Sequence, residues 1–175
     1  MEIRKITAEN RDALRLKNEP FPLLGRLIPS YTEETWSWRE ELWPEAERSE
    51  MCFPDEPYDF DAMAAEYTVL GAFEGEACIG LVLLKSAWMR YMYVEDLKVN
   101  RACRRRGVGR ALMEAAMAEA VGQGYRGLYL IAQDNNLVAC RFYLGLGYRI
   151  GGFDNQVYRG TSQDGKGDLY FYRDA

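Results

Sequence analysis

Three consecutive arginines run directly into two closely spaced glycines, and a strongly helical segment follows. The first amides of a helix have no acceptor within the helix, and the helix dipole favours an anion at that end. Glycines let the backbone approach a bulky phosphate, and arginines add charge-assisted hydrogen bonds. The stretch therefore predicts a pyrophosphate cradle with glycines, backbone amides of residues 105–110 and arginine charge, formed by Arg104, Arg105, Arg106, Gly107, Val108, Gly109 and Arg110.

Two other interpretations of this stretch were open: a solvated helix start and a basic patch for nucleic acid. The protein is acidic, with a formal net charge of -5, and it has no second basic run. Nucleic-acid binders usually carry a broad basic face, so a nucleic-acid partner is not expected. The stretch is not a phosphate loop ending in Gly-Lys-Ser/Thr, and Leu112 stands where the dinucleotide motif needs its third glycine.

The choice of proton-transfer groups is narrow because the chain has no histidine. This excludes Ser-His-Asp and Cys-His catalysis and histidine-bound zinc, and no metal is expected. Proton transfer must then fall to a carboxylate, a tyrosine, a cysteine, an amine or water. The four cysteines lie far apart without a CxxC pair, which favours reduced thiols.

The elements that must position these residues follow from periodicity and turn signals. We expect one domain, residues 1–175, with a mixed sheet and helices on both faces. Helices are predicted over residues 7–16 with Thr7 as cap, from Thr32 to residue 43, and over 108–124 and 135–147. Strands are predicted over residues 2–6, 67–85 (a hairpin turning at 74–76), 90–99, 127–132, 148–158 and 168–173, with residues 18–31 irregular.

The segments "VEDLKV", "RRRGVGRALM" and "NNLVACRFYLGLGY", in this order, resemble the GNAT superfamily of N-acetyltransferases. The resemblance implies a GNAT fold: a largely antiparallel sheet of about seven strands, splayed at the cofactor site. It also implies acetyl-CoA as co-substrate, with its pyrophosphate on the arginine–glycine loop. The implied cofactor contacts elsewhere are the backbone before that loop and a later helix: Leu97, Lys98, Val99, Asn136, Ala139 and Tyr143.

More of the chain is similar to the streptothricin (nourseothricin) acetyltransferases, through "EPFPLLGRLIPSY", "WMRYMYVEDLKV", "QDNNLVACRFY" and "GGFDNQVYRG". This implies direct acetyl transfer, in a ternary complex, to the β-lysine amine of that antibiotic. A polyamine, another amine or a protein amino group stays open as acceptor, and so does a non-catalytic acyl-CoA-binding module. The chain departs from that family at Ile131 and Lys166, where a glutamate is usual.

Acetylation of an amine needs a base, because a substrate ammonium has a pKa of about 10. Glu95 and Asp96 are the candidates, and strand alternation would let only one of them face the substrate. The family pattern favours Glu95, and Asp96 could instead bond a neighbouring loop. Tyr143 is the candidate acid for the departing thiolate, with helix packing as the alternative. An acyl-cysteine route through Cys103 or Cys140 is the competing mechanism.

The acidic segment Glu40–Asp61 holds nine carboxylates against Arg48, and it could attract a polycationic amine or be a solvated loop. A cationic small-molecule amine is therefore the expected partner. No apolar run reaches membrane-spanning length and the N-terminus lacks a signal-peptide pattern, so we expect a cytoplasmic protein without membrane contact. A homodimer through the terminal strand is left open.

Overall fold

The structure is a computed structural model that describes residues 1–175. Its strands hydrogen-bond in the order β1-β6-β7-β8-β9-β11-β10, with separate pairs β2-β5 and β3-β4. The fold is mixed α/β with a mostly antiparallel sheet of seven strands, as expected. The elements are β1 (Glu2–Lys5), β2 (Phe21–Leu23), β3 (Gly25–Thr32), β4 (Thr35–Leu42), β5 (Ser49–Met51), α1 (Phe60–Met63), β6 (Tyr67–Glu74), β7 (Ala77–Lys85), β8 (Tyr91–Val99), α2 (Val108–Gly122), β9 (Gly127–Gln133), α3 (Leu137–Gly145), β10 (Arg149–Asp154) and β11 (Asp168–Asp174).

The chain divides into two compact units. Unit 1 comprises residues 1–19, 53–128 and 174–175, and unit 2 comprises residues 20–52 and 129–173. None of the helices is long and apolar enough to cross a membrane.

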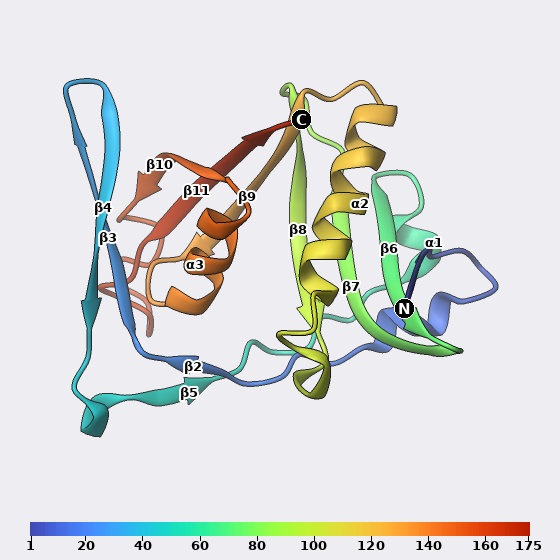
Figure 1. Ribbon diagram of the computed structural model, residues 1–175, viewed down its shortest axis with the longest axis horizontal. Coiled ribbons are helices and arrows are strands. Elements are labelled where there is room, and N and C mark those ends of the chain that lie inside the picture. The colour runs from blue at the N-terminus through green and yellow to red at the C-terminus, as the bar shows by residue number, and fades with distance from the viewer. The chain divides into compact units, whose positions relative to one another are not determined.

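Unit 1 packs helices on both faces of the antiparallel strands β1, β6, β7 and β8 (Figure 1). Helix α2 covers one face, where a Cβ on Gly80 would lie only 3.0 Å from Leu112 of the helix. Glycine at this position therefore lets α2 approach β7 closely. Side chains alternate along β7, so Leu81 and Leu83 point to the opposite face and pack against Leu14 of the 3-10 helix Arg11–Arg15.

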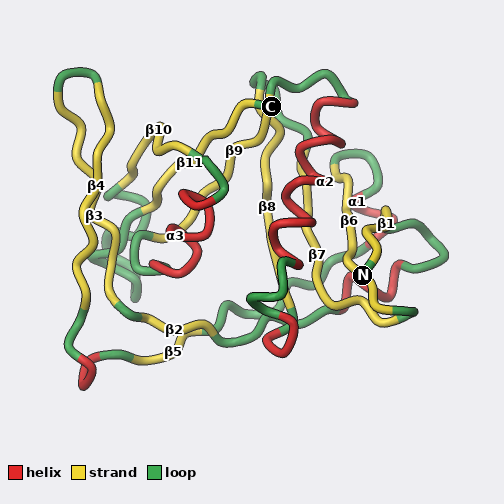
Figure 2. The backbone as a smooth tube through the Cα atoms, viewed as in Figure 1, coloured by secondary structure: helices red, strands yellow, loops and turns green.

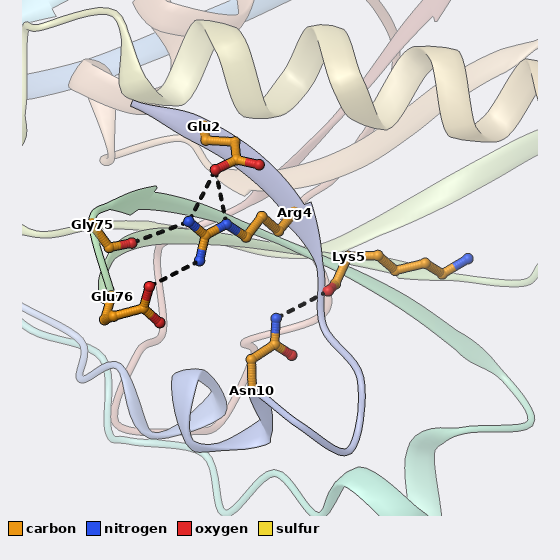
Figure 3. Close-up of polar contacts among 6 residues, drawn as sticks. All are labelled: Glu2, Arg4, Lys5, Asn10, Gly75 and Glu76. Carbon is orange, nitrogen blue, oxygen red and sulfur yellow. Dashed lines mark hydrogen bonds and ion pairs between the residues drawn. The ribbon is translucent and has the colours of Figure 1, made fainter.

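Strand β1 is held at the edge of unit 1 by a group of polar contacts (Figure 3). The Arg4 guanidinium donates to the Glu2 carboxylate and to the Gly75 carbonyl, and it also pairs with Glu76 at the β6–β7 turn. The Asn10 amide donates to the carbonyl of Lys5. These contacts fix the start of the chain to the turn between β6 and β7.

Unit 2 is built on β10 and β11, which pair antiparallel, and on two further antiparallel pairs (Figure 2). Helix α3 packs against β2 and β3, and β4 lies beside β10. Inside this unit the Leu27 amide of β3 donates to the Asp134 carbonyl at the end of β9. That bond ties the β3–β4 hairpin to the segment that leads into α3.

The helix expected from Thr32 to residue 43 is wrong: these residues form β4 and pair with β3 in an eight-residue register. Thr32 pairs with Thr35, so the loop is Glu33-Glu34, and both residues have positive φ, 49° and 60°. Two consecutive positive φ values are typical of the turn that matches the twist of a hairpin. Helix-favouring glutamates and arginine were overridden by pairing with a neighbouring strand.

Two other expected boundaries near the N-terminus were also wrong. The helix predicted over residues 7–16 is a 3-10 helix that begins only at Arg11, after Asn10, and Thr7 does not cap it. The segment predicted as irregular contains β2 and most of β3, with Pro22 on a short strand and Pro29 within β3. The other expected helices and strands are present, although the strand expected over residues 148–158 ends at Asp154.

Candidate functional site

Strand β8 carries a bulge at Glu95. Along the β7–β8 pair, Leu83 lies opposite Asp96 and Leu84 lies opposite Val94, so Glu95 is the extra residue. A bulge interrupts the two-residue alternation of a strand, often re-aiming a side chain beside an active site. Strict alternation therefore does not apply at this point, and the expectation that only one of Glu95 and Asp96 faces the substrate stays a prediction. Their contacts separate them instead.

Asp96 is engaged by other side chains of unit 1. Its Oδ2 accepts a hydrogen bond of 2.9 Å from the Tyr58 hydroxyl and lies 3.2 Å from Nζ of Lys98. The Lys98 ammonium is 5% exposed and lies 4.9 Å from the centre of the Tyr58 ring. Burial and the Asp96 charge raise the pKa of Tyr58 well above its usual value. Asp96 therefore compensates a buried ammonium.

Glu95 has the opposite environment. It is exposed, and its carboxylate has no hydrogen-bond or ion-pair partner within the chain. Its charge contributes to the raised pKa of the Lys85 ammonium, after a hydrogen bond with Tyr67. An exposed, unpaired carboxylate on a bulge can accept a proton from a ligand or a water.

The loop after β8 leads directly into the N-terminus of α2 (Figure 1). Gly107 is the N-cap with a left-handed φ of 85°, and Arg105 also has a positive φ, 60°. The first helical hydrogen bond runs from the Ala111 amide to the Gly107 carbonyl, so the amides of Val108, Gly109 and Arg110 have no acceptor in the helix. A Cβ on Gly107 would meet nothing within 4 Å. The geometry leaves an open helix start suited to an anion.

The arginines of this loop differ in what they contact. Arg104 donates to the Val99 carbonyl and to the Glu19 carbonyl, which ties the loop to the end of β8. Arg106 lies 2.5 Å from the Glu74 carboxylate, and Arg110 pairs with Glu114. Only Arg105 makes no side-chain bond within the chain. Arg105 is therefore the arginine most available to an incoming anion.

In unit 2, Asn136 stands at the N-cap of α3. Its Oδ1 accepts a hydrogen bond of 3.2 Å from the Ala139 amide, so the side chain closes the first turn of the helix. Its side-chain amide nitrogen has no partner within the chain and can donate to a ligand. This bond brings Asn136 and Ala139 together, and their contact with the cofactor stays a prediction.

Tyr143 lies on the buried side of α3, 9% exposed, among other aromatic rings. Its ring centre is 5.9 Å from that of Tyr148, edge to face, and 5.9 Å from that of Phe171. The Tyr148 hydroxyl is buried without a hydrogen-bond partner, and burial raises its pKa. The aromatic packing fixes the orientation of the Tyr143 ring within unit 2.

The two buried cysteines, Cys103 and Cys140, have little access to solvent. Burial raises the pKa of Cys140 to about 12, so its thiol stays protonated near neutral pH. The Cys103 sulfur, 8% exposed, accepts a hydrogen bond of 3.4 Å from Arg106. No group of three or more His, Cys, Asp or Glu side chains could hold a metal ion.

The acidic segment Glu40–Asp61 is mostly exposed and partly structured, with β5, α1 and a 3-10 helix, Glu45–Glu47. Within unit 2 its Glu40 pairs with Arg141, which lowers the pKa of that carboxyl. Arg48 donates to the Trp43 carbonyl. Most of the carboxylates in this segment remain in solvent, where they add to the negative potential.

Sequence reasoning missed Tyr58 and the bulge at Glu95. Tyr58 lies in a loop rich in acidic residues and proline, and no periodic pattern marks it. The bulge had a weak signal, because two adjacent carboxylates in one strand cannot both fit strict alternation. Ile131 and Lys166, the departures noted above, are both half-buried in unit 2.

Comparisons with known proteins show the family to which the chain belongs. The sequence profile of the Acetyltransferase (GNAT) family matches residues 30–148. Streptothricin acetyltransferase A of Bacillus subtilis (strain 168) is 33% identical over 165 residues, covering 89% of this chain and 90% of that protein. A crystal structure of a provisionally named streptothricin acetyltransferase from Bacillus anthracis, in complex with acetyl coenzyme A, has a TM-score of 0.88 at 27% identity and 99% coverage of both chains. The crystal structure of nourseothricin acetyltransferase has a TM-score of 0.79 at 26% identity, covering 99% of this chain and 97% of that one.

Proposed function

Because the chain belongs to the acetyltransferase (GNAT) family, we propose that it acetylates an amino group of streptothricin or a similar cationic antibiotic, with acetyl-CoA as acetyl donor. The observation that carries the donor is the open start of α2, where three amides lack acceptors behind a left-handed Gly107. The acceptor is supported by similarity over most of the chain to streptothricin acetyltransferases.

The residues of unit 1 that would hold the donor fit a pyrophosphate ester. The amides of residues 108–110 and the Arg105 guanidinium would bind it, because these donors have no partners within the chain. The backbone of Leu97–Val99 would bond the pantetheine arm, with Lys98 anchored by its ion pair to Asp96. In unit 2, the unpartnered amide nitrogen of Asn136 would add a further donor.

A bound thioester supplies an acetyl carbon that an amine nitrogen can attack. Glu95 would take the proton of the substrate ammonium, directly or through water, because its carboxylate is exposed and unpaired. Backbone amides near Leu97–Val99 would stabilise the negative charge on the carbonyl oxygen. Tyr143 would protonate the departing thiolate as the carbon–sulfur bond breaks, and the second proton lost by the acylated nitrogen would return to Tyr143 through water. No covalent enzyme intermediate is needed, and the protonated Cys140 thiol is consistent with direct transfer.

Acceptor identity is tested by mixing the protein with acetyl-CoA and separate acceptors, then following release of free thiol. The panel contains streptothricin, spermidine and a lysine-rich peptide. Release that saturates at the lowest concentration with streptothricin is the expected result. Saturation only with spermidine or the peptide would indicate a polyamine or protein acceptor instead. No thiol release with any acceptor would favour a non-catalytic acyl-CoA-binding module.

A further inference from the structure

A chain of hydrogen bonds in unit 2 ends on a buried carboxylate. The Lys166 ammonium donates to Oε1 of Gln163 at 3.0 Å. The side-chain nitrogen of Gln133 donates to that same oxygen and to the Tyr158 hydroxyl, each at 2.9 Å. The Tyr158 hydroxyl in turn donates to Asp168 at 2.9 Å.

The direction of this chain follows from its first member. A lysine ammonium can only donate, so the oxygen of Gln163 must face Lys166. The atom of Gln133 that approaches this oxygen must then be its nitrogen, which leaves Oε1 of Gln133 pointing elsewhere. That oxygen is buried and has no hydrogen-bond partner, in a side chain that is 8% exposed overall. An unmet acceptor in the interior is costly, so it calls for a donor.

Asp168 has an equally unusual environment. It is 9% exposed and has no cation within ion-pair distance, and Tyr158 is its one side-chain donor. The other buried carboxylate of this unit, Asp134, pairs with Arg26 and accepts from the Gly167 amide. Burial raises the pKa of Asp168, and the charges of Asp154 and Asp134 raise it further. Asp168 therefore lacks the positive partner that Asp134 has.

We propose that Asp168 and Gln133 form a subsite for an ammonium group of the acceptor, a second amine that is not the one acetylated. A primary ammonium carries three donors and a positive charge, which match a carboxylate and an unmet carbonyl oxygen. The Gln133 amide and the Tyr158 hydroxyl have no donor left for an anion, because their protons are already used in this chain of hydrogen bonds. Tyr158, which contacts both residues, is half-exposed.

The subsite rests on the proposed function and narrows it to acceptors with at least two amino groups. Two probes separate this requirement from acetylation itself: 3,6-diaminohexanamide and 3-aminohexanamide, which differ by one amine. The native protein is expected to bind the diamine about tenfold more tightly than the monoamine, as one charge-assisted contact provides. Calorimetric titration of each probe measures this preference without any turnover.

The variant Asp168→Asn removes the charge and keeps the shape of the side chain. We expect it to weaken diamine binding about tenfold and to leave monoamine binding unchanged. Asp154→Asn is the matched control, because Asp154 already accepts from two backbone amides, those of Gln156 and Val157. Equal weakening for both probes in Asp168→Asn, or no diamine preference in the native protein, would overturn the subsite.

The stability of the Asp168→Asn variant provides a second test, because a carboxylate with a purely structural role would give a different result. The raised pKa of Asp168 means that its ionised form is less favourable in the folded protein than in the unfolded chain. Its contribution to the free energy of unfolding therefore falls as the pH rises from the usual pKa of 3.8 through the raised pKa. Asp168→Asn should therefore unfold at a higher temperature than the native protein at pH 7, and the difference should shrink toward pH 4. Lower stability at pH 7 would make Asp168 structural and contradict the proposal.

The two proposals fail in different ways. If neither probe nor streptothricin is acetylated but calorimetry shows the diamine preference, the proposed function is wrong and the subsite stands. If streptothricin is acetylated and Asp168→Asn binds both probes as the native protein does, the subsite is wrong and the proposed function stands.

Discussion

The Tyr58 hydroxyl and the Lys98 ammonium converge on one oxygen of Asp96, at 2.9 Å and 3.2 Å. The neighbouring carboxylate, Glu95, sits on the bulge and contacts no cation within ion-pair distance. Two adjacent acidic residues thus have separate tasks. Asp96 compensates a buried positive charge, and Glu95 is the exposed carboxylate that we propose as the base.

Replacement of Asp96 by asparagine should cost stability. The change would leave the Lys98 ammonium buried without its counter-charge, and breaking a buried pair from one side costs about 3–5 kcal/mol. Urea unfolding monitored by fluorescence measures the change in the free energy of unfolding. A variant that stays as stable as the native protein but loses turnover would make Asp96 the base instead.

Replacement of Glu95 by glutamine should lower kcat about 10²-fold or more, because a general base contributes about 10²–10⁴-fold. Stability should change little, since this carboxylate is exposed and unpaired. Steady-state kinetics at saturating acetyl-CoA and amine provides the check. An unaltered kcat would rule out Glu95 as base.

Replacement of Gly107 by alanine should weaken acetyl-CoA. The left-handed φ of 85° costs an L-residue about 1–2 kcal/mol, and the new Cβ would enter the open space at the start of α2. Gly124→Ala is the matched control, because Gly124 has φ 87° and similarly empty surroundings. Both variants should lose similar stability, and only Gly107→Ala should raise the KM for acetyl-CoA, by about tenfold. Equal KM values in the two variants would contradict the cradle.

Replacement of Tyr143 by phenylalanine should lower kcat by about 10²-fold with little change in the KM for acetyl-CoA, because only the acid is removed. Tyr148→Phe offers a control in the same aromatic group. Its hydroxyl is buried without a partner, so removing it should be neutral or stabilising and leave kcat unchanged. Steady-state kinetics of both variants measures the difference. Unchanged turnover in Tyr143→Phe would remove the tyrosine from the mechanism.

Replacement of Cys140 by alanine should leave acetyl transfer intact. With its pKa raised to about 12, the thiol has almost no thiolate at neutral pH and cannot carry an acyl group efficiently. A chromogenic disulfide reagent should modify the exposed Cys52 quickly in the folded protein and Cys140 only after unfolding. Acetylated Cys140 found by mass spectrometry after incubation with acetyl-CoA would instead support the covalent route.

The sequence predicted best where one local signal and the fold agree. The arginine–glycine loop, α2 and α3 carry helix-start residues and apolar faces that tertiary packing reinforces, so their positions follow from the pattern. Strand β4 was predicted as a helix because its glutamates and arginine favour helices, while pairing with β3 decides its conformation. Local propensity cannot see a partner strand.

Side-chain partners were largely out of reach of the sequence. The arginine run predicts positive charge, yet Arg104 donates a hydrogen bond to the Val99 carbonyl and Arg106 donates one to Glu74. The choice between Glu95 and Asp96 depended on Tyr58, which is 38 residues from Asp96 along the chain. Such contacts depend on the conformations of loops, which cannot be predicted from composition.

The open start of α2 has a consequence for which substitutions the protein can tolerate. The groups proposed to bind the anion are main-chain amides, which every residue except proline supplies, so substitutions at the exposed Arg110 leave these donors in place. Gly107 is the exception, because its backbone conformation is hard for any other residue to adopt. Diverging relatives could therefore change the charge and size of the side chains around this loop, and with them the acceptor. Their main-chain amides would still be available to bind the same donor.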